Sequence, residues 1–292
     1  MVTSIDKDLA RSSRYADLLS ILRSLAIESS GLIVAYSGGV DSAFLLAAAV
    51  ESTAGLGESA PVTALTAISP SYPTWEREPA RALTTQLGVV HLELETSELS
   101  NPHYRANAGD RCFHCKSALF DVADWARESE RHRLHGALVY GAVTDDLGDH
   151  RPGMNAAQER AVRAPLIEAH LSKADVRSIS RDLGLLTWDK PASACLSSRF
   201  PYGVEVTAQR LEQVGRCESR MHTLGLLIVR ARYHQELVRL EFGQVELERI
   251  FSDPPLREIV IKECKAVGFK FVSIDLQGYR SGSANEALIV LK

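Results

Sequence analysis

The sequence contains one short segment whose residue types are suited to binding an anion. Ser37–Ser42, with the sequence SGGVDS, separates two apolar runs. Two adjacent glycines allow the backbone to turn several N–H groups toward a ligand, and the serine hydroxyls add further donors. A helix that begins near Asp41 would add the positive end of its dipole, which favours phosphate. The spacing does not match a GxxxxGK[ST] or a GxGxxG loop, and a simple tight turn between a strand and a helix is the alternative.

Cysteine thiols form the second group of residues that could do chemistry. Cys112 and Cys115 form a C-x-x-C within DRCFHCK, and Cys195 lies in SACLSSRFPYG. The spacing alone leaves a redox pair, a zinc site and an iron–sulfur site open. Three thiolates can hold three irons of a [4Fe–4S] cluster and leave the fourth iron open to a sulfide or a substrate.

Cys195 could also act without the other thiols. Lys190 and Arg199 lie near it in the sequence, and these cations would favour the nucleophilic thiolate form. The remaining two cysteines, Cys217 and Cys264, are interpreted as small buried apolar residues.

The elements that must position these residues alternate along the first half of the chain. Apolar runs predict strands at 32–36, 62–68, 89–94 and 136–140, and amphipathic or small-residue segments predict helices at 7–28, 43–50, 74–87 and 115–127. This order predicts an α/β fold with a parallel sheet that is covered by helices on both faces. Ligands of such sheets bind at the carboxyl ends of the strands, where residues 37–42, 101–115 and 141–153 all fall.

A second, smaller domain is expected after residue 202. Following a helix at 172–183 and a loop with several prolines, the pattern predicts helices at 209–224 and 255–267 and strands at 226–232, 237–242 and 270–274. We therefore expect a nucleotide-binding domain over 1–202, a small α+β domain over 203–276 and a flexible tail over 277–292.

The composition limits the classes of partner. The 292 residues are 45% hydrophobic and 24% charged, with a net charge of −4 and an isoelectric point near 6.2. The acidic balance argues against nucleic acid as a partner. The apolar runs are shorter than a membrane span, and the N-terminal residues do not resemble a leader. These features predict a cytoplasmic protein with reduced cysteines.

Several segments together resemble a known family. SGGVDS after the first strand is similar to the PP-loop of ATP pyrophosphatases, which bind ATP, adenylate a substrate and release pyrophosphate. DRCFHCK, GAVTDDLGDHRPG (141–153) and DKPASACLSSRFPYG (189–203) narrow the resemblance to the LarE family of ATP-dependent sulfur transferases. The resemblance extends over residues 32–234.

The resemblance implies a specific reaction. LarE proteins act in the synthesis of the nickel-pincer nucleotide cofactor of lactate racemase. They adenylate the carboxylates of pyridinium-3,5-biscarboxylic acid mononucleotide, and sulfur then replaces AMP. In some members a cysteine at the position of Cys195 gives up its own sulfur and becomes dehydroalanine, whereas others carry three cysteines and resemble [4Fe–4S] enzymes. Because this chain has all three, the cluster type is favoured, with the sacrificial type as the alternative. A PP-loop tRNA thiolase and a non-enzymatic nucleotide sensor are further alternatives.

The same resemblance, with the expected strand ends, assigns roles to individual residues. The ATP site is expected to comprise Ala35, Ser37, Gly38, Gly39, Asp41, Ser42, Thr66 and Gly141. Asp41 would bind Mg²⁺ that is shared with the phosphates. For Ala35 and Thr66, packing between strands is the alternative.

Residues of the expected second domain and the loop before it are assigned to the substrate. Arg230 and Arg232 would bind the phosphate of the mononucleotide, with Arg199 and Lys190 as further candidates. Glu218 matches a position linked in the family to the substrate or a metal. The alternatives are a solvated edge strand for Arg230 and Arg232, a surface cation for Arg199 and an exposed helix position for Glu218. Family members also tend to be homo-oligomers.

Overall fold

The chain folds into two compact units, each assembled from separate stretches of sequence. In this computed structural model the described residues are 4–129, 132, 134–148, 152–191 and 194–280. The first unit comprises residues 1–68, 76–96 and 112–193, and the second comprises residues 69–75, 97–111 and 194 onward. The assignment of functional domains to 1–202, 203–276 and 277–292 stays a prediction, and residues 281–292 of the expected tail lie outside the described part.

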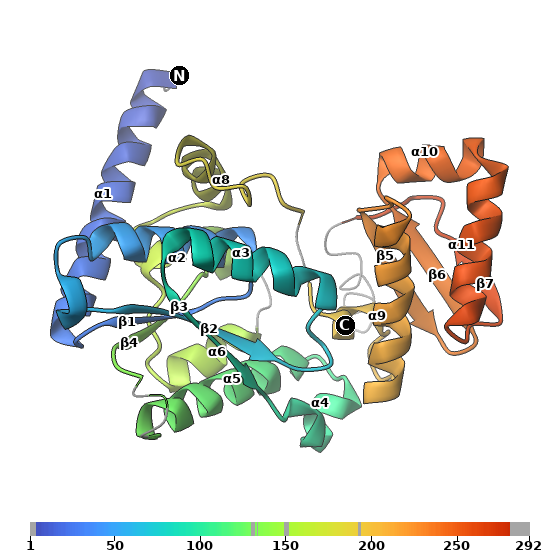
Figure 1. Ribbon diagram of the computed structural model, residues 1–292, viewed down its shortest axis with the longest axis horizontal. Coiled ribbons are helices and arrows are strands. Elements are labelled where there is room, and N and C mark those ends of the chain that lie inside the picture. Colours follow the sequence, from blue (N-terminus) through green and yellow to red (C-terminus); the bar gives the residue numbers. More distant parts are fainter. Residues whose placement is uncertain (1–3, 130–131, 133, 149–151, 192–193, 281–292) are drawn as a thin grey trace. The chain divides into compact units, whose positions relative to one another are not determined.

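The first unit is built on a parallel sheet of four strands (Figure 1). Its order is β3-β2-β1-β4, and β1 pairs in parallel with both β2 and β4. The strands are β1 (Leu32–Ala35), β2 (Val62–Ile68), β3 (Val90–Glu95) and β4 (Ala137–Tyr140). The predicted fold class is confirmed, because strands and helices alternate and all pairings in this sheet are parallel.

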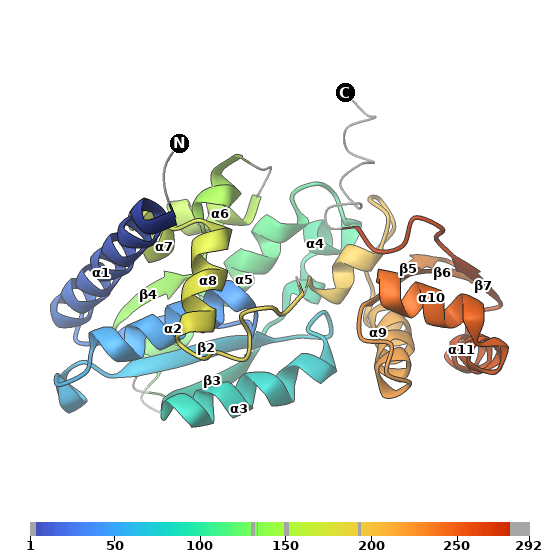
Figure 2. The same cartoon turned by 90° about the horizontal axis from the view of Figure 1, so that it is seen from above.

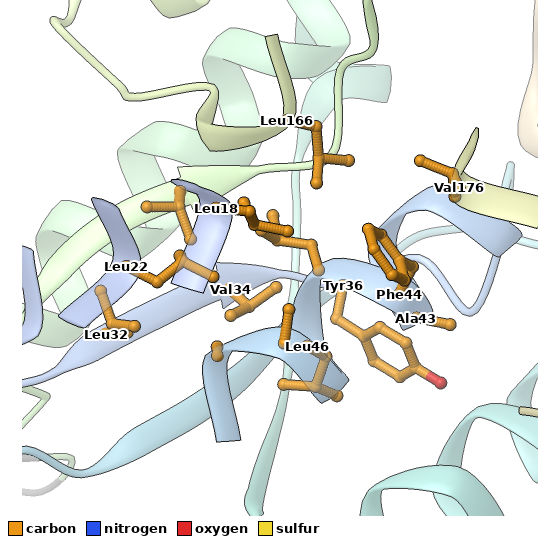
Figure 3. Packing of buried hydrophobic residues seen from close by; sticks show 14 of the residues in the cluster. Leu18, Leu22, Leu32, Val34, Tyr36, Ala43, Phe44, Leu46, Leu166 and Val176 are labelled. Atoms are coloured by element: carbon orange, nitrogen blue, oxygen red, sulfur yellow. The ribbon is translucent and has the colours of Figure 1, made fainter. Parts of the chain in front are cut away.

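Helices cover both faces of this sheet because successive residues of a strand point to opposite sides. Leu32 and Val34 of β1 pack with α1, α2, α3 and α8, whereas Ile33 and Ala35 pack with α5 and α6. Figure 3 shows Leu18 and Leu22 of α1 beside Leu32 and Val34, and α8 lies against α2 (Figure 2). The helices are α1 (Ser4–Glu28), α2 (Val40–Ser52), α3 (Arg77–Leu87), α5 (Arg111–Glu128), α6 (Pro152–Glu159), α7 (Pro165–Glu168) and α8 (Lys173–Asp182).

The second unit contains a mixed sheet of three strands. The order is β5-β6-β7, with β5 antiparallel and β7 parallel to β6. Its elements are α4 (Pro102–Ala106), α9 (Ala208–Thr223), β5 (Val229–His234), β6 (Leu237–Phe242), α10 (Gln244–Ser252), α11 (Pro254–Ala266) and β7 (Phe271–Ile274). Cys217 and Cys264 are both fully buried here, as the sequence predicts, with their Sγ atoms 3.5 Å apart.

The predicted elements differ from the structure at several places. The helix expected at 115–127 begins four residues earlier, so Cys112 and Cys115 both lie within its first turns. Residues 101–111, expected to be irregular, contain α4, whose first turn is capped by the Asn101 side chain with Pro102 at the first helical position. The helices α6, α7 and α10 were not predicted. No helix among the described residues is long and apolar enough to cross a membrane.

Candidate functional site

The SGGVDS segment forms the connection between β1 and α2, as predicted. Gly38 has a φ of +75°, which favours glycine, and Gly39 occupies the cap of α2 without a side chain. The Ser42 hydroxyl donates to the Gly39 carbonyl at 3.1 Å and accepts from the Ser37 amide at 3.2 Å. The two serines therefore fix the turn from within, and the first turn of α2 presents backbone N–H groups that suit an anion.

Two lysines that are distant in sequence contact this loop. The Lys173 ammonium lies 2.6 Å and 2.5 Å from the two carboxylate oxygens of Asp41. Lys190 donates to the Gly38 carbonyl at 2.8 Å and also pairs with Glu76. Sequence reasoning placed Lys190 beside Cys195 and did not single out Lys173. The sequence marks Lys173 only as the first residue of a helix that is capped by Ser172, which does not indicate contact with the loop.

Gly141, at the end of β4, packs against the same loop. A Cβ at this position would lie 3.0 Å from the Asp41 carbonyl carbon and 3.0 Å from the Ser42 amide nitrogen. Such contacts are tighter than normal van der Waals packing allows. Glycine at 141 therefore keeps the end of β4 in contact with the loop backbone.

The two strand residues assigned to adenosine are both buried. Ala35 ends β1, and Thr66 lies within β2. The Thr66 hydroxyl donates to the Tyr36 carbonyl at 2.6 Å and lies 2.8 Å from His91 Nε2. These contacts favour the strand-packing alternative for Thr66, and contact of either residue with adenosine stays a prediction.

The C-x-x-C is presented at the start of α5 in the first unit. Cys112 is exposed and Cys115 is partly buried. Lys116 follows directly, with its ammonium 5.1 Å from the centre of the Tyr140 ring. Burial lowers the pKa of Lys116, while the nearby Cys115 and Cys112 thiols act in the opposite direction. Lys116 is thus a cation beside both thiols that sequence reasoning did not single out.

Cys195 lies in the second unit, directly before a short 3₁₀ turn at Leu196–Arg199. Three contacts from other segments of this unit hold the turn. The Leu196 amide donates to the Ser71 carbonyl at 2.8 Å, and the Tyr104 hydroxyl lies 2.6 Å from the Ser197 hydroxyl. Arg111 donates to the Ser197 carbonyl at 2.8 Å. The backbone around Cys195 is therefore fixed by residues 69–75 and 97–111.

Five charged side chains are buried next to this turn, and none is a solvated surface group. Their exposed fractions are 1% for Arg199, 0% for Glu218, 9% for Arg230, 8% for Arg232 and 2% for Glu241. The alternatives of a surface cation for Arg199, an exposed helix position for Glu218 and a solvated strand for Arg230 and Arg232 are therefore wrong. Charged side chains are rarely buried unless they are paired.

These five side chains include two ion pairs. Arg199 pairs with Glu218 at 2.8 Å, and Arg232 pairs with Glu241 at 2.7 Å. Arg230 donates to the Val229 carbonyl at 2.8 Å, and its guanidinium lies 4.9 Å from the centre of the Tyr279 ring. Burial and the neighbouring Arg199 lower the pKa of Arg230, with Glu218 opposing. These five side chains carry three positive and two negative charges, a balance that suits an anionic group.

The described residues contain no group of three or more His, Cys, Asp or Glu side chains placed to hold a metal ion. Cys112 and Cys115 belong to the first unit and Cys195 to the second, so their joint ligation of a cluster stays a prediction. The segment after β4 carries three further carboxylates that could hold Mg²⁺ or fix the loop, Asp145, Asp146 and Asp149. Asp146 accepts from the Val143 amide and Asp145 from the Lys173 amide. Asp149 lies outside the described residues.

Comparison with known proteins identifies the family. No protein-family model matches the chain. It is 42% identical over 270 residues, or 92% of its length and 97% of the relative, to the uncharacterized protein slr1717 of Synechocystis. It is 33% identical over 282 residues to the pyridinium-3,5-bisthiocarboxylic acid mononucleotide synthase of Lactiplantibacillus plantarum, covering 94% and 95% of the two chains.

A solved structure is also similar. The NMN synthetase of Francisella tularensis matches 88% of this chain and 94% of its own, with a TM-score of 0.43 and 16% identity. The full-length match to the Lactiplantibacillus plantarum enzyme agrees with the motif resemblance noted in the sequence. The chain therefore belongs to the LarE family of sulfur transferases.

Proposed function

We propose that this protein adenylates the carboxylates of pyridinium-3,5-biscarboxylic acid mononucleotide with ATP and then replaces AMP with sulfur. The observation that carries the proposal is the loop at 37–42, whose backbone N–H groups at the start of α2 suit an anion, in a chain of the LarE family. The name of the Lactiplantibacillus plantarum relative, a bisthiocarboxylic acid mononucleotide synthase, describes the expected product.

The first unit supports the adenylation step. Ser37, Gly38, Gly39 and Ser42 would hold the leaving pyrophosphate through backbone N–H groups and hydroxyls. Asp41 supplies carboxylate oxygens of the kind that Mg²⁺ prefers, so the residues present fit this ion. Mg²⁺ would neutralise charge on the phosphates. Lys173, which pairs with Asp41, would place a second cation beside the phosphates.

The second unit supports binding of the substrate. Arg230 and Arg232 lie two residues apart on β5, so their side chains leave the same face of the strand. The excess positive charge of their cluster favours the phosphate of the mononucleotide. These two arginines would therefore fix the substrate, while the loop at 37–42 holds ATP.

The sulfur step depends on thiols. Cys112 and Cys115 are placed on one helical turn, where the thiols suit ligation of iron, and Cys195 would be the third ligand. A [4Fe–4S] cluster would supply an open iron that carries sulfide. In the alternative, the Cys195 thiolate attacks the acyl-adenylate, AMP leaves, and elimination breaks the Cβ–Sγ bond to give dehydroalanine and the thiocarboxylate. That alternative gives no reason for the C-x-x-C, so the cluster is favoured.

Pyrophosphate release tests the first step. ATP with the biscarboxylic acid mononucleotide should give pyrophosphate, and Asp41→Asn should reduce the rate. Tight binding of ATP without substrate-dependent release would instead support a nucleotide sensor and overturn the proposal.

A cysteine series tests the sulfur source. Cys112→Ala, Cys115→Ala and Cys195→Ala should each abolish the iron, the acid-labile sulfide and the visible absorbance of the anaerobic protein. Cys264→Ala, which removes a buried thiol elsewhere, should retain them. Loss of activity in Cys195→Ala alone, together with a mass loss at Cys195 after turnover, would establish the sacrificial route.

A further inference from the structure

We infer that Arg199 and Glu218 act together as a positioning pair that holds the backbone at Cys195, and that neither side chain binds the substrate phosphate or a metal ion. The inference rests on the proposed function, in which Cys195 handles sulfur. It assigns the two residues a role that differs from the one their family positions suggest.

The contacts of Arg199 lie within the protein. Its Nε and Nη2 donate to the two carboxylate oxygens of Glu218, both at 2.8 Å. Its Nη1 donates to the Ala194 carbonyl at 2.8 Å, the Cys195 carbonyl at 3.1 Å and the Ser198 hydroxyl at 2.9 Å. Because the side chain is 1% exposed, a phosphate would have to displace these acceptors from a buried guanidinium.

Both carboxylate oxygens of Glu218 also accept hydrogen bonds from groups within the protein. Oε1 accepts from Arg199 and from the Ala231 amide, the latter at 2.7 Å, and Oε2 accepts from Arg199. Although burial alone would raise the pKa of Glu218, Arg199 and Arg230 hold it below its usual value. A metal ion that took this carboxylate would leave Arg199 buried without its counter-charge, which is strongly unfavourable.

These bonds connect the core of the second unit to the Cys195 backbone. The Ala231 amide of β5 donates to Glu218 on α9, and Glu218 orients the guanidinium of Arg199. Arg199 in turn donates to the carbonyls of residues 194 and 195. A bidentate guanidinium–carboxylate pair restricts orientation more than a lysine can, because its geometry is planar. The position of the Cys195 thiol thus depends on an ion pair that does not touch the substrate.

The inference predicts different effects on pyrophosphate release and on thiocarboxylate formation. Loss of a residue that binds the substrate phosphate would impair both reactions. In Arg199→Lys and Glu218→Gln, substrate-dependent pyrophosphate release should keep its KM for the mononucleotide within about twofold, since substrate binding is retained. Thiocarboxylate formation should fall by about 100-fold, as expected for a misplaced reacting group. Arg216→Lys and Glu212→Gln, an exposed pair on the same helix, are the matched controls and should change neither rate.

Alkylation of Cys195 gives a readout that needs no turnover. In the apoprotein, the rate at which iodoacetamide modifies Cys195, followed by peptide mass spectrometry, should change in Arg199→Lys and Glu218→Gln but not in the two controls. This measurement stays informative if wild-type protein releases no pyrophosphate, so failure of the proposed function and failure of this inference can be distinguished.

Two results would overturn the inference. One is a raised KM for the mononucleotide in Arg199→Lys with unchanged Cys195 alkylation, which would make Arg199 a phosphate ligand. The other is loss of a bound divalent metal in Glu218→Gln with unchanged Cys195 alkylation. If Arg199→Lys does not fold, Glu218→Gln, which keeps the shape of the side chain, supplies the same comparison.

Discussion

At the scale of single residues, Gly141 shows how the loop at 37–42 depends on a neighbour that is remote in sequence. The main chain at 141 packs on the backbone of Asp41 and Ser42, where a methyl group would be too close. The loop therefore keeps its conformation through contacts from β4 as well as through its own serines.

Gly141→Ala should weaken ATP binding. Inserting a methyl group against backbone atoms costs about 1–3 kcal/mol, which corresponds to roughly 5- to 150-fold in affinity if the strain falls on the loop. Calorimetric titration with ATP measures the effect. Gly148→Ala is the control, because a Cβ there has no atom within 4 Å, and equal affinities of the two variants would contradict the prediction.

The sequence predicts some roles of individual residues and not others. It predicts the burial of Cys217 and Cys264, because small apolar side chains favour the interior. It does not predict the burial of Arg199, because an arginine is normally exposed and its partner Glu218 lies 19 residues further along. Only the fold brings Lys173 to Asp41 across 132 residues of sequence.

At the scale of elements, α8 supports the loop at 37–42 through two side chains one turn apart. Lys173 pairs with Asp41 directly. Arg177 donates to the carbonyls of Trp188 and Lys190, each at 2.8 Å, and Lys190 contacts Gly38. The helix thus reaches the loop once directly and once through the segment at 188–190.

Arg177→Ala should raise the KM for ATP by about tenfold, equivalent to about 1.4 kcal/mol for the loss of charge-assisted hydrogen bonds that position Lys190. Steady-state pyrophosphate release checks this. Arg23→Ala is the control for Arg177→Ala. Arg23 also donates to two backbone carbonyls, those of Ser52 and Ala54, but these lie at the far end of α2 from the loop. A similar rise in both variants would show that the effect is general destabilisation.

Prediction of elements from the sequence succeeded where the periodicity was strong. The alternating strands and helices of residues 32–140 were identified because each segment has one clear pattern. The start of α5 was placed too late because its first turn, RCFH, directly follows a polar segment that contains a glycine. The helix α10 was missed because it lies between a glycine and two prolines in a short stretch.

At the scale of the whole molecule, stability should depend on pH through groups whose pKa values differ between the folded and unfolded states. Burial lowers the pKa of His91 and of His234 below the usual 6.5. Hydrogen bonds from Arg81 and Arg77 lower the pKa of Glu93 to about 2. Above pH 6.5 the folded and unfolded states bind the same number of protons at these three sites.

Stability should therefore fall as the pH drops below 6.5, because the unfolded histidines take up protons first. A second loss should begin near pH 4.5, where Glu93 becomes protonated in the unfolded chain but not yet in the folded one. Urea unfolding across this range measures both losses. His91→Gln should reduce the first, the exposed His103→Gln should not, and equal slopes for these two variants would contradict the role of His91.

The assembly of the second unit from three stretches has a consequence for protein synthesis. Its residues at 69–75 and 97–111 are synthesised long before residue 194. Their hydrogen bonds to Leu196 and Ser197 can therefore form only after those residues have been synthesised. A gene fragment that encodes only residues 194 onward would lack these stretches and the hydrogen bonds that they give to the Cys195 turn. Nascent chains that lack residues 196–199 cannot form this turn either, so the Cys195 turn is completed only late in translation.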